Sequence, residues 1–172
     1  MTTNNDDITI DPDATYPFNV TDITIPSYKF TTSISEWLVT NLTSLTDKND
    51  NPLFHKVNTG YNESTLKTFS GKPTCDVYIN RVDYDSTFDS PHPETVHTII
   101  LFYLKGANNT AYSKCCELHD YLMQEFIENE NFRCLDEIVE NTIITNSQLM
   151  MQPINKKWGV MGALELAHKI IY

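Results

Sequence analysis

The segment at residues 96–105, VHTIILFYLK, constrains the fold more than any other part of the chain. Its β-branched and aromatic residues favour an extended conformation. Neighbouring side chains of a strand point to opposite faces of the sheet. One face would carry Val96, Ile100, Phe102 and Leu104, and the other Ile99, Leu101 and Tyr103. A strand that is apolar on both sides must be covered on both sides.

Two segments have the apolar spacing of helices. Ser33 and Glu36 form a capping box before an apolar series, which predicts a helix over residues 34–46. The polar run DKNDNP at 47–52 predicts the turn that ends it. A second apolar stripe follows Asn109 or Thr110, either of which can cap a helix that runs to about residue 128.

Alternating apolar residues predict further strands at 75–85, 138–147 and 158–172, and a short strand fits 53–58. We interpret 129–133 as a linker and 150–157 as a loop or strand junction. In the strand at 75–85, one face is expected to carry Cys75, Val77 and Ile79, and the other Tyr78, Val82 and Tyr84.

This order of elements predicts an α+β fold: an antiparallel or mixed sheet of four to five strands with two helices on one face. At 172 residues the chain fits one domain, which we place at 32–172. Residues 1–31 contain three prolines and three pairs of apolar residues at spacing two, which predicts an extended N-terminal arm lying on its own body or on a neighbour. The pairs are Ile8 and Ile10, Phe18 and Val20, and Ile23 and Ile25.

The second face of this sheet is the first candidate functional surface. Two helices, each roughly 10 Å wide, cover only one face of a four- or five-stranded sheet. Large apolar patches usually mark contacts with other chains. We therefore predict an oligomer interface on the second face, at Tyr78, Tyr84, Ile99, Leu101 and Tyr103. The alternative is that the chain's own arm covers this face.

The segment at 60–73 is the second candidate. It contains few large apolar residues, which predicts a long exposed loop, and long loops in compact domains are often functional. We predict that it contacts a partner through Gly60, Tyr61, Lys67, Gly71 and Lys72.

Charge and missing motifs disfavour several classes of function. The net charge of −11 repels nucleic-acid backbones. No apolar run is long enough to span a bilayer, and residues 1–7 are polar, so neither a membrane segment nor a signal peptide is expected. No P-loop, GxGxxG, GxSxG or HExxH motif occurs, and the four cysteines lack the spacing of a zinc site. We therefore predict no enzyme, with no catalytic, cofactor-binding or metal-ligating residue.

Two clusters keep a thiol or metal-dependent enzyme as the third hypothesis. Cys115, Cys116 and His119 share one helical stripe, which is better explained as core. His92 and His97 lie near a glutamate but supply too few ligands for a designed metal site.

Four segments together resemble the tail terminator, or tail completion, proteins of long-tailed phages. The segments are SISEWLVTNLTSL as the first helix, ETVHTIILFYLKG as the central strand, AYSKCCELHDYLMQEFI as the following helix and WGVMGALELAHKII as the closing strand. The resemblance covers residues 33–171 and rests on patterns of shape. The arm at 1–31 is longer than a minimal terminator needs, which leaves another neck component open.

The resemblance implies a subunit of a ring, commonly hexameric, that caps the tail tube and joins it to the head. It implies self-assembly, tail-tube and head-connector proteins as partners, and DNA that only passes through the channel. The protein would be made in the host cytoplasm and reside in the virion neck. The alternative function is a monomeric or dimeric binding or regulatory module without catalysis.

Overall fold

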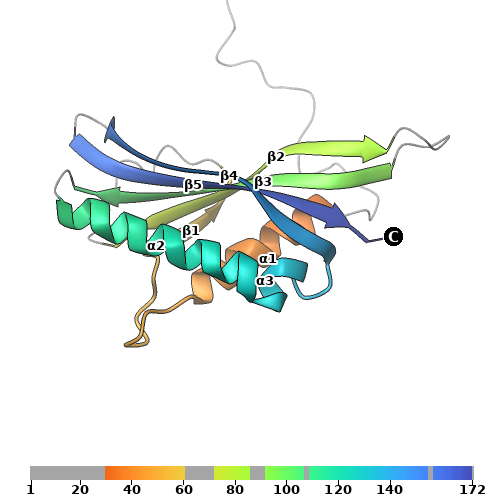
Figure 1. Ribbon diagram of the computed structural model, residues 1–172, viewed down its shortest axis with the longest axis horizontal. Coiled ribbons are helices and arrows are strands. Elements are labelled where there is room, and N and C mark those ends of the chain that lie inside the picture. Colours follow the sequence, from red (N-terminus) through yellow and green to blue (C-terminus); the bar gives the residue numbers. More distant parts are fainter. Residues whose placement is uncertain (1–29, 61–71, 86–91, 107–108, 155–156, 172) are drawn as a thin grey trace, which may run out of the picture.

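The computed structural model describes residues 30–60, 72–85, 92–106, 109–154 and 157–171, which form a five-stranded sheet with three helices on one face (Figure 1). The helices are α1 Phe30–Ser44, α2 Asn109–Glu128 and α3 Glu130–Cys134. The strands are β1 Lys56–Thr59, β2 Thr74–Asp85, β3 His92–Lys105, β4 Val139–Ile154 and β5 Lys157–Ile170. Their order is β1-β2-β3-β5-β4, with β1 parallel to β2 and the other pairs antiparallel. The α+β class and the mixed sheet are thus confirmed.

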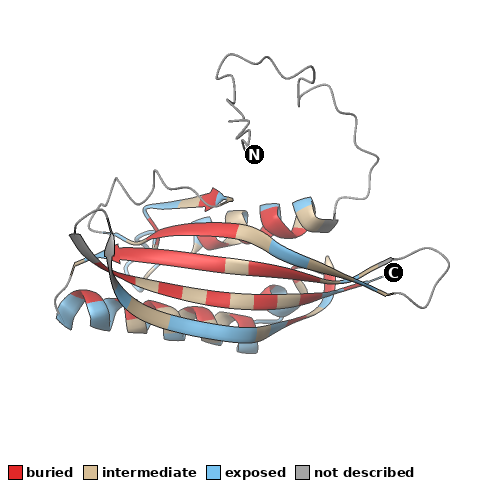
Figure 2. Cartoon of the chain, turned by 90° about the horizontal axis from the view of Figure 1, so that it is seen from above, coloured by how far each residue is buried: buried red, intermediate tan, exposed pale blue. Residues whose placement is uncertain are grey.

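β3 lies at the centre of the sheet, between β2 and β5. Its two faces divide as the alternation predicts. Val96, Ile100, Phe102 and Leu104 belong to the main core, whereas Leu101, Tyr103 and Ile99 belong to a separate cluster on the opposite face. Figure 2 shows β3 buried along most of its length.

The main core lies between the sheet and the helices. α1 contributes Ile34, Leu38 and Leu42, and α2 contributes Leu122 and Phe126. The predicted first helix exists but begins four residues early, at Phe30. Ser33 therefore lies inside α1, and the capping box predicted for Ser33 and Glu36 is wrong.

The short helix α3 replaces the linker predicted at 129–133. Asn129 accepts a hydrogen bond from the backbone N–H of Asn131 and so caps it. Phe132 packs edge-on against Trp37 and Phe126, with ring centroids 5.1 and 5.2 Å apart. The Trp37 indole N–H donates to the Asp136 carboxylate at 2.7 Å. Phe132 thus joins α1 to α2 by contacting both. The polar composition of residues 129–133 does not reveal this contact.

The C-terminal hairpin is longer than predicted. β4 continues from Val139 to Ile154 and pairs with β5 as far as Ile154 and Lys157, so a loop over 150–157 is wrong. The strand junction, the other interpretation of this segment, lies between Ile154 and Lys157. β4 lies at the edge of the sheet, where a proline such as Pro153 is tolerated because one side of the strand makes no ladder bonds.

β2 also departs from simple alternation. Cys75 and Val77 are in the main core, and Ile79 packs against it, as predicted. Val82 packs against the same core, although it was expected on the opposite face. The cause is a register shift between Ile79 and Arg81, because one extra residue in a strand reverses the side chains that follow.

Candidate functional site

The candidate site is the face of the sheet opposite the helices, which we call the helix-free face. Within the described residues, all three helices lie on the other side (Figure 1). The register places Asp76 beside Leu101 and Tyr78 beside Ile99. The partners on β5 are Glu165 for Ile99 and Ala163 for Leu101. Three strands thus contribute side chains to one continuous surface.

Half of this face is apolar. Leu101 and Tyr103 form its buried centre, at 9% and 1% exposure, and four partly buried residues pack around them. These four are Tyr78, Ile99, Met161 and Ala163. We call the six residues the tyrosine cluster. A partner would therefore contact its half-buried rim, because the centre is already inaccessible within one chain.

The structure brings together four of the five residues predicted as an oligomer interface: Tyr78, Ile99, Leu101 and Tyr103. Tyr84 lies beyond a second register shift of β2, is 58% exposed and is outside the cluster. Met161 and Ala163 were missed, because alternation within one strand does not reveal which strand will lie beside it. The role of these residues as an interface stays a prediction.

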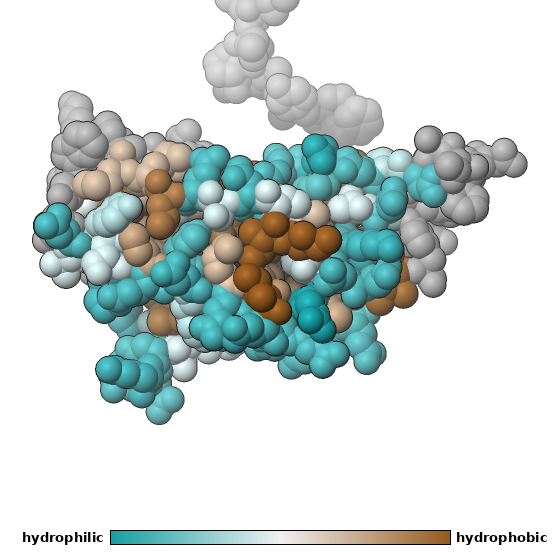
Figure 3. Space-filling model, viewed as in Figure 1, coloured by the Kyte–Doolittle hydropathy of each residue, from teal (hydrophilic) through white to brown (hydrophobic). Residues whose placement is uncertain are grey.

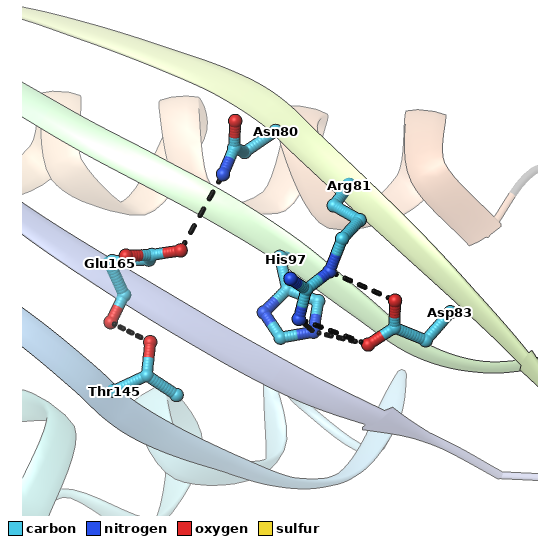
Figure 4. Close-up of polar contacts among 6 residues, drawn as sticks. All are labelled: Asn80, Arg81, Asp83, His97, Thr145 and Glu165. Atoms are coloured by element: carbon cyan, nitrogen blue, oxygen red, sulfur yellow. Dashed lines mark hydrogen bonds and ion pairs between the residues drawn. The ribbon is translucent and has the colours of Figure 1, made fainter.

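The other half of the face is polar (Figure 4). Arg81 and Asp83 form an ion pair with Nε and Oδ1 2.9 Å apart, and His97 Nε2 lies 2.9 Å from Asp83 Oδ2. Desolvation acts to raise the pKa of the Asp83 carboxyl, but hydrogen bonding to His97 and the charge of Arg81 outweigh it and lower the pKa. Arg81 and Asp83 are largely solvent-accessible, whereas the His97 side chain is 8% exposed.

Glu165 lies between the two halves. Asn80 donates to its carboxylate at 3.5 Å, and the Thr145 hydroxyl donates to its backbone carbonyl at 3.1 Å (Figure 4). These contacts connect side chains of β2 and β4 to β5 across the face. The result is a patterned surface, apolar at one end and charged at the other, which favours one orientation of a bound partner.

A buried polar pair lies at the β1 end of the sheet. Asn58 Nδ2 donates to Asp76 Oδ1 at 2.7 Å, and both residues are buried. Asp76 makes further interactions. A buried carboxylate must be hydrogen-bonded to be tolerated, so this pair holds β1 in register against β2.

The second predicted site, the loop at 60–73, lies only partly within the described residues. Gly60 has a left-handed backbone, with φ of 80°, and its N–H donates to the Val77 carbonyl at 2.7 Å. Lys72 is exposed and lines a cavity of about 570 Å³ together with Asp47 and Lys114. Tyr61, Lys67 and Gly71 lie outside the described residues, as do residues 1–29 of the predicted arm.

The two buried thiols, Cys75 and Cys115, are poorly suited to nucleophilic chemistry. Burial raises the pKa of the Cys75 thiol and raises that of Cys115 to about 12. The nucleophile is the thiolate, which is scarce at neutral pH when the pKa is this high. In the part of the chain that the structure describes, no three His, Cys, Asp or Glu side chains gather as metal ligands.

Two further findings are not tied to the site. No helix among the described elements combines the length and the apolar composition needed to cross a bilayer. Comparison with protein-family models and with curated proteins found no match for this chain.

Proposed function

We propose that this chain is a non-catalytic structural subunit that assembles into a hexameric ring in the neck of a long-tailed phage. There it caps the tail tube and joins it to the head. The observation that carries the proposal is the helix-free face, whose half-buried apolar rim at Tyr78, Ile99, Met161 and Ala163 faces away from all the described helices. Apolar area of this kind is stabilised by a second chain.

Two features of the sequence support the phage context. The four segments that resemble tail terminators include α2 and β3, which build the centre of the domain. The net charge of −11 suits a channel wall that repels DNA and lets it slide. The partners in this proposal are other copies of the chain, the tail tube and the head connector. The protein acts in the virion after synthesis in the host cytoplasm.

The burial of Leu101 and Tyr103 within one chain favours a second candidate, a monomeric or dimeric binding module. In that case the helix-free face is completed mainly by the chain itself. The two candidates differ in their oligomeric state.

Size-exclusion chromatography with light scattering, followed by negative-stain imaging, tests the proposal. We expect rings, either from the purified chain or after tail-tube ends are added. A chain that stays monomeric at high concentration and forms no ring on tail-tube ends would contradict the proposal.

A matched pair of substitutions tests the surface itself. Ala163 and Ala167 lie four residues apart on the same face of β5, one in the tyrosine cluster and one beside His97. We expect Ala163→Glu to shift rings to monomers, because it places a charge in the apolar contact. Ala167→Glu should leave rings intact, because Arg81 and His97 are near the new carboxylate. Circular dichroism checks that both variants fold.

A further inference from the structure

A groove runs between the C-terminal half of α2 and the outer edge of β4. Its volume is about 640 Å³, and its helix wall consists of Met123, Phe126 and Ile127. Its strand wall is residues 141–147 of β4. Ile127 is 58% exposed. Figure 3 shows hydrophobic side chains gathered over the region where α2 and β4 meet in Figure 1.

The strand wall of this groove is suited to pair with another strand. β4 is last in the sheet order, and among the described residues no strand lies on its outer side. Natural edge strands usually carry lysines or other charges that block pairing. Residues 141–154 contain no charged side chain. Two register shifts, on either side of residues 141–144, leave four residues in regular pairing beside the groove.

The N-terminal region contains a segment of matching length and chemistry. The tetrapeptide Asp-Ile-Thr-Ile occurs twice, at 7–10 and at 22–25, and a proline follows each copy within two residues. Two isoleucines at spacing two lie on one face of a strand, so both can enter the same groove. The prolines end the strand after four residues because they cannot continue a ladder.

We propose that residues 22–25 of one copy add as a strand to the outer edge of β4 in a second copy, with Ile23 and Ile25 in the groove beside Phe126 and Ile127. The inference rests on the proposed assembly and adds a second contact to the one proposed on the helix-free face. A contact between two different surfaces is heterologous, and it gives a ring when the rotation from copy to copy closes. Arg133 also lines the groove and offers a positive charge with which Asp22 can pair.

Chain length favours a second copy over the molecule's own arm. α1 packs against β1 and β2 at one long edge of the sheet, and β4 forms the other edge (Figure 2). From β2 to a strand added outside β4 there are four steps of about 4.8 Å, or about 19 Å. Five residue steps separate Ile25 from Phe30, and they span at most about 18 Å. Residues 22–25 would therefore reach the groove of their own chain only with a fully extended link to Phe30, which favours a second copy.

Photo-crosslinking of the full-length chain tests this contact. The photoreactive residue p-benzoylphenylalanine replaces Ile23, and irradiated assemblies are separated on a denaturing gel and mapped by mass spectrometry. We expect dimer-sized products that join residue 23 to residues 123–147 of another copy. A monomer-sized product at the groove would show that the chain's own arm occupies it and would overturn the inference, as would crosslinks confined to other surfaces.

Two exposed residues of α2 provide matched variants for the same experiment. Ile127→Asp removes an apolar side chain from the groove, whereas Tyr112→Asp removes one from the other end of the helix, outside it. We expect Ile127→Asp to weaken the crosslink by at least about tenfold, the loss expected when a charge replaces one buried apolar group. Tyr112→Asp should leave the yield unchanged, and equal losses in both variants would overturn the inference.

Failure of this contact can be distinguished from failure of the proposed function. Rings that form without any crosslink at the groove overturn the contact and leave the assembly function standing. A chain that forms neither rings nor intermolecular crosslinks, with and without tail-tube ends, overturns both.

Discussion

The two faces of the sheet use the same strands in different ways. On the helix-covered face, Ile100, Phe102 and Leu164 are fully buried in one large core. On the helix-free face, the apolar residues form a small cluster bordered by ion pairs. The covered face therefore provides most of the stability of the fold, while the helix-free face remains available for recognition.

Truncating one large apolar side chain on each face should show the largest difference. Leu164→Ala removes a fully buried group and leaves a cavity, so we expect the free energy of unfolding to fall by about 2–5 kcal/mol. Ile99→Ala acts on a half-buried side chain of the tyrosine cluster and should cost about 1 kcal/mol in a monomeric chain. Urea denaturation at low protein concentration measures both values. Equal losses would show that the two faces contribute alike.

Adding a methyl group at Gly162 probes the packing of the covered face. The ring of Phe102 lies against this glycine, so a Cβ at residue 162 would overlap it. Because Phe102 is fully buried and has no space to move into, we expect Gly162→Ala to cost about 1–3 kcal/mol. Ala163→Ser, one residue along on the helix-free face, should cost less. Combining Gly162→Ala with Phe102→Leu should recover part of the loss, and purely additive effects would contradict this explanation.

Two histidines on opposite faces should differ in their effect on pH dependence. His168 is fully buried between the hydroxyls of Thr98 and Thr142, at 2.7 and 2.9 Å. Burial, aided by the nearby His97, lowers the pKa of His168 from 6.5 to about 3. Below pH 6.5 the unfolded chain binds a proton at this residue that the folded chain does not bind. The free energy of unfolding should therefore fall on acidification, with a slope approaching about 1 kcal/mol per pH unit.

Urea denaturation at several pH values between about 6.5 and 4.5 measures this slope, since ordinary carboxyl groups titrate mostly below that window. We expect His168→Gln to remove most of the slope. His97→Gln, on the helix-free face, should retain most of it, because burial is the main cause of the lowered pKa of His168. A slope that is unchanged in His168→Gln would contradict the assignment.

Local patterns predicted the elements whose side chains alternate or repeat without interruption. The alternation of residues 96–105 correctly divided β3 between two environments, and the apolar stripe of α2 gave its end at Glu128. The helix α3 was missed because its only buried side chain, Phe132, is stabilised by Trp37, which is 95 positions away in the sequence. The capping box at Ser33 failed because such short patterns also occur within helices.

Candidate site residues were predicted where alternation within one strand puts them on the same face. They were missed where only the pairing of two strands brings them together. Tyr78 and Leu101 were found from alternation alone. The first register shift of β2 turns Val82 toward the main core, and Tyr84, beyond the second shift, lies outside the tyrosine cluster. The network of Arg81, Asp83 and His97 joins two strands and has no signature in either segment. A bulge and a strand order both depend on contacts between distant residues.

The sequence by itself determined that β3 would be apolar on both faces and that its neighbouring helices would cover one of them, because these properties follow from the period of side chains along a single segment. Only the tertiary structure decided which strands lie beside β3, that residues 141–154 of β4 would form an uncharged outer edge, and that α2 and β4 would line one groove. These features arise from pairing between segments far apart in the chain, where the free energy of packing, rather than local preference, selects the partner.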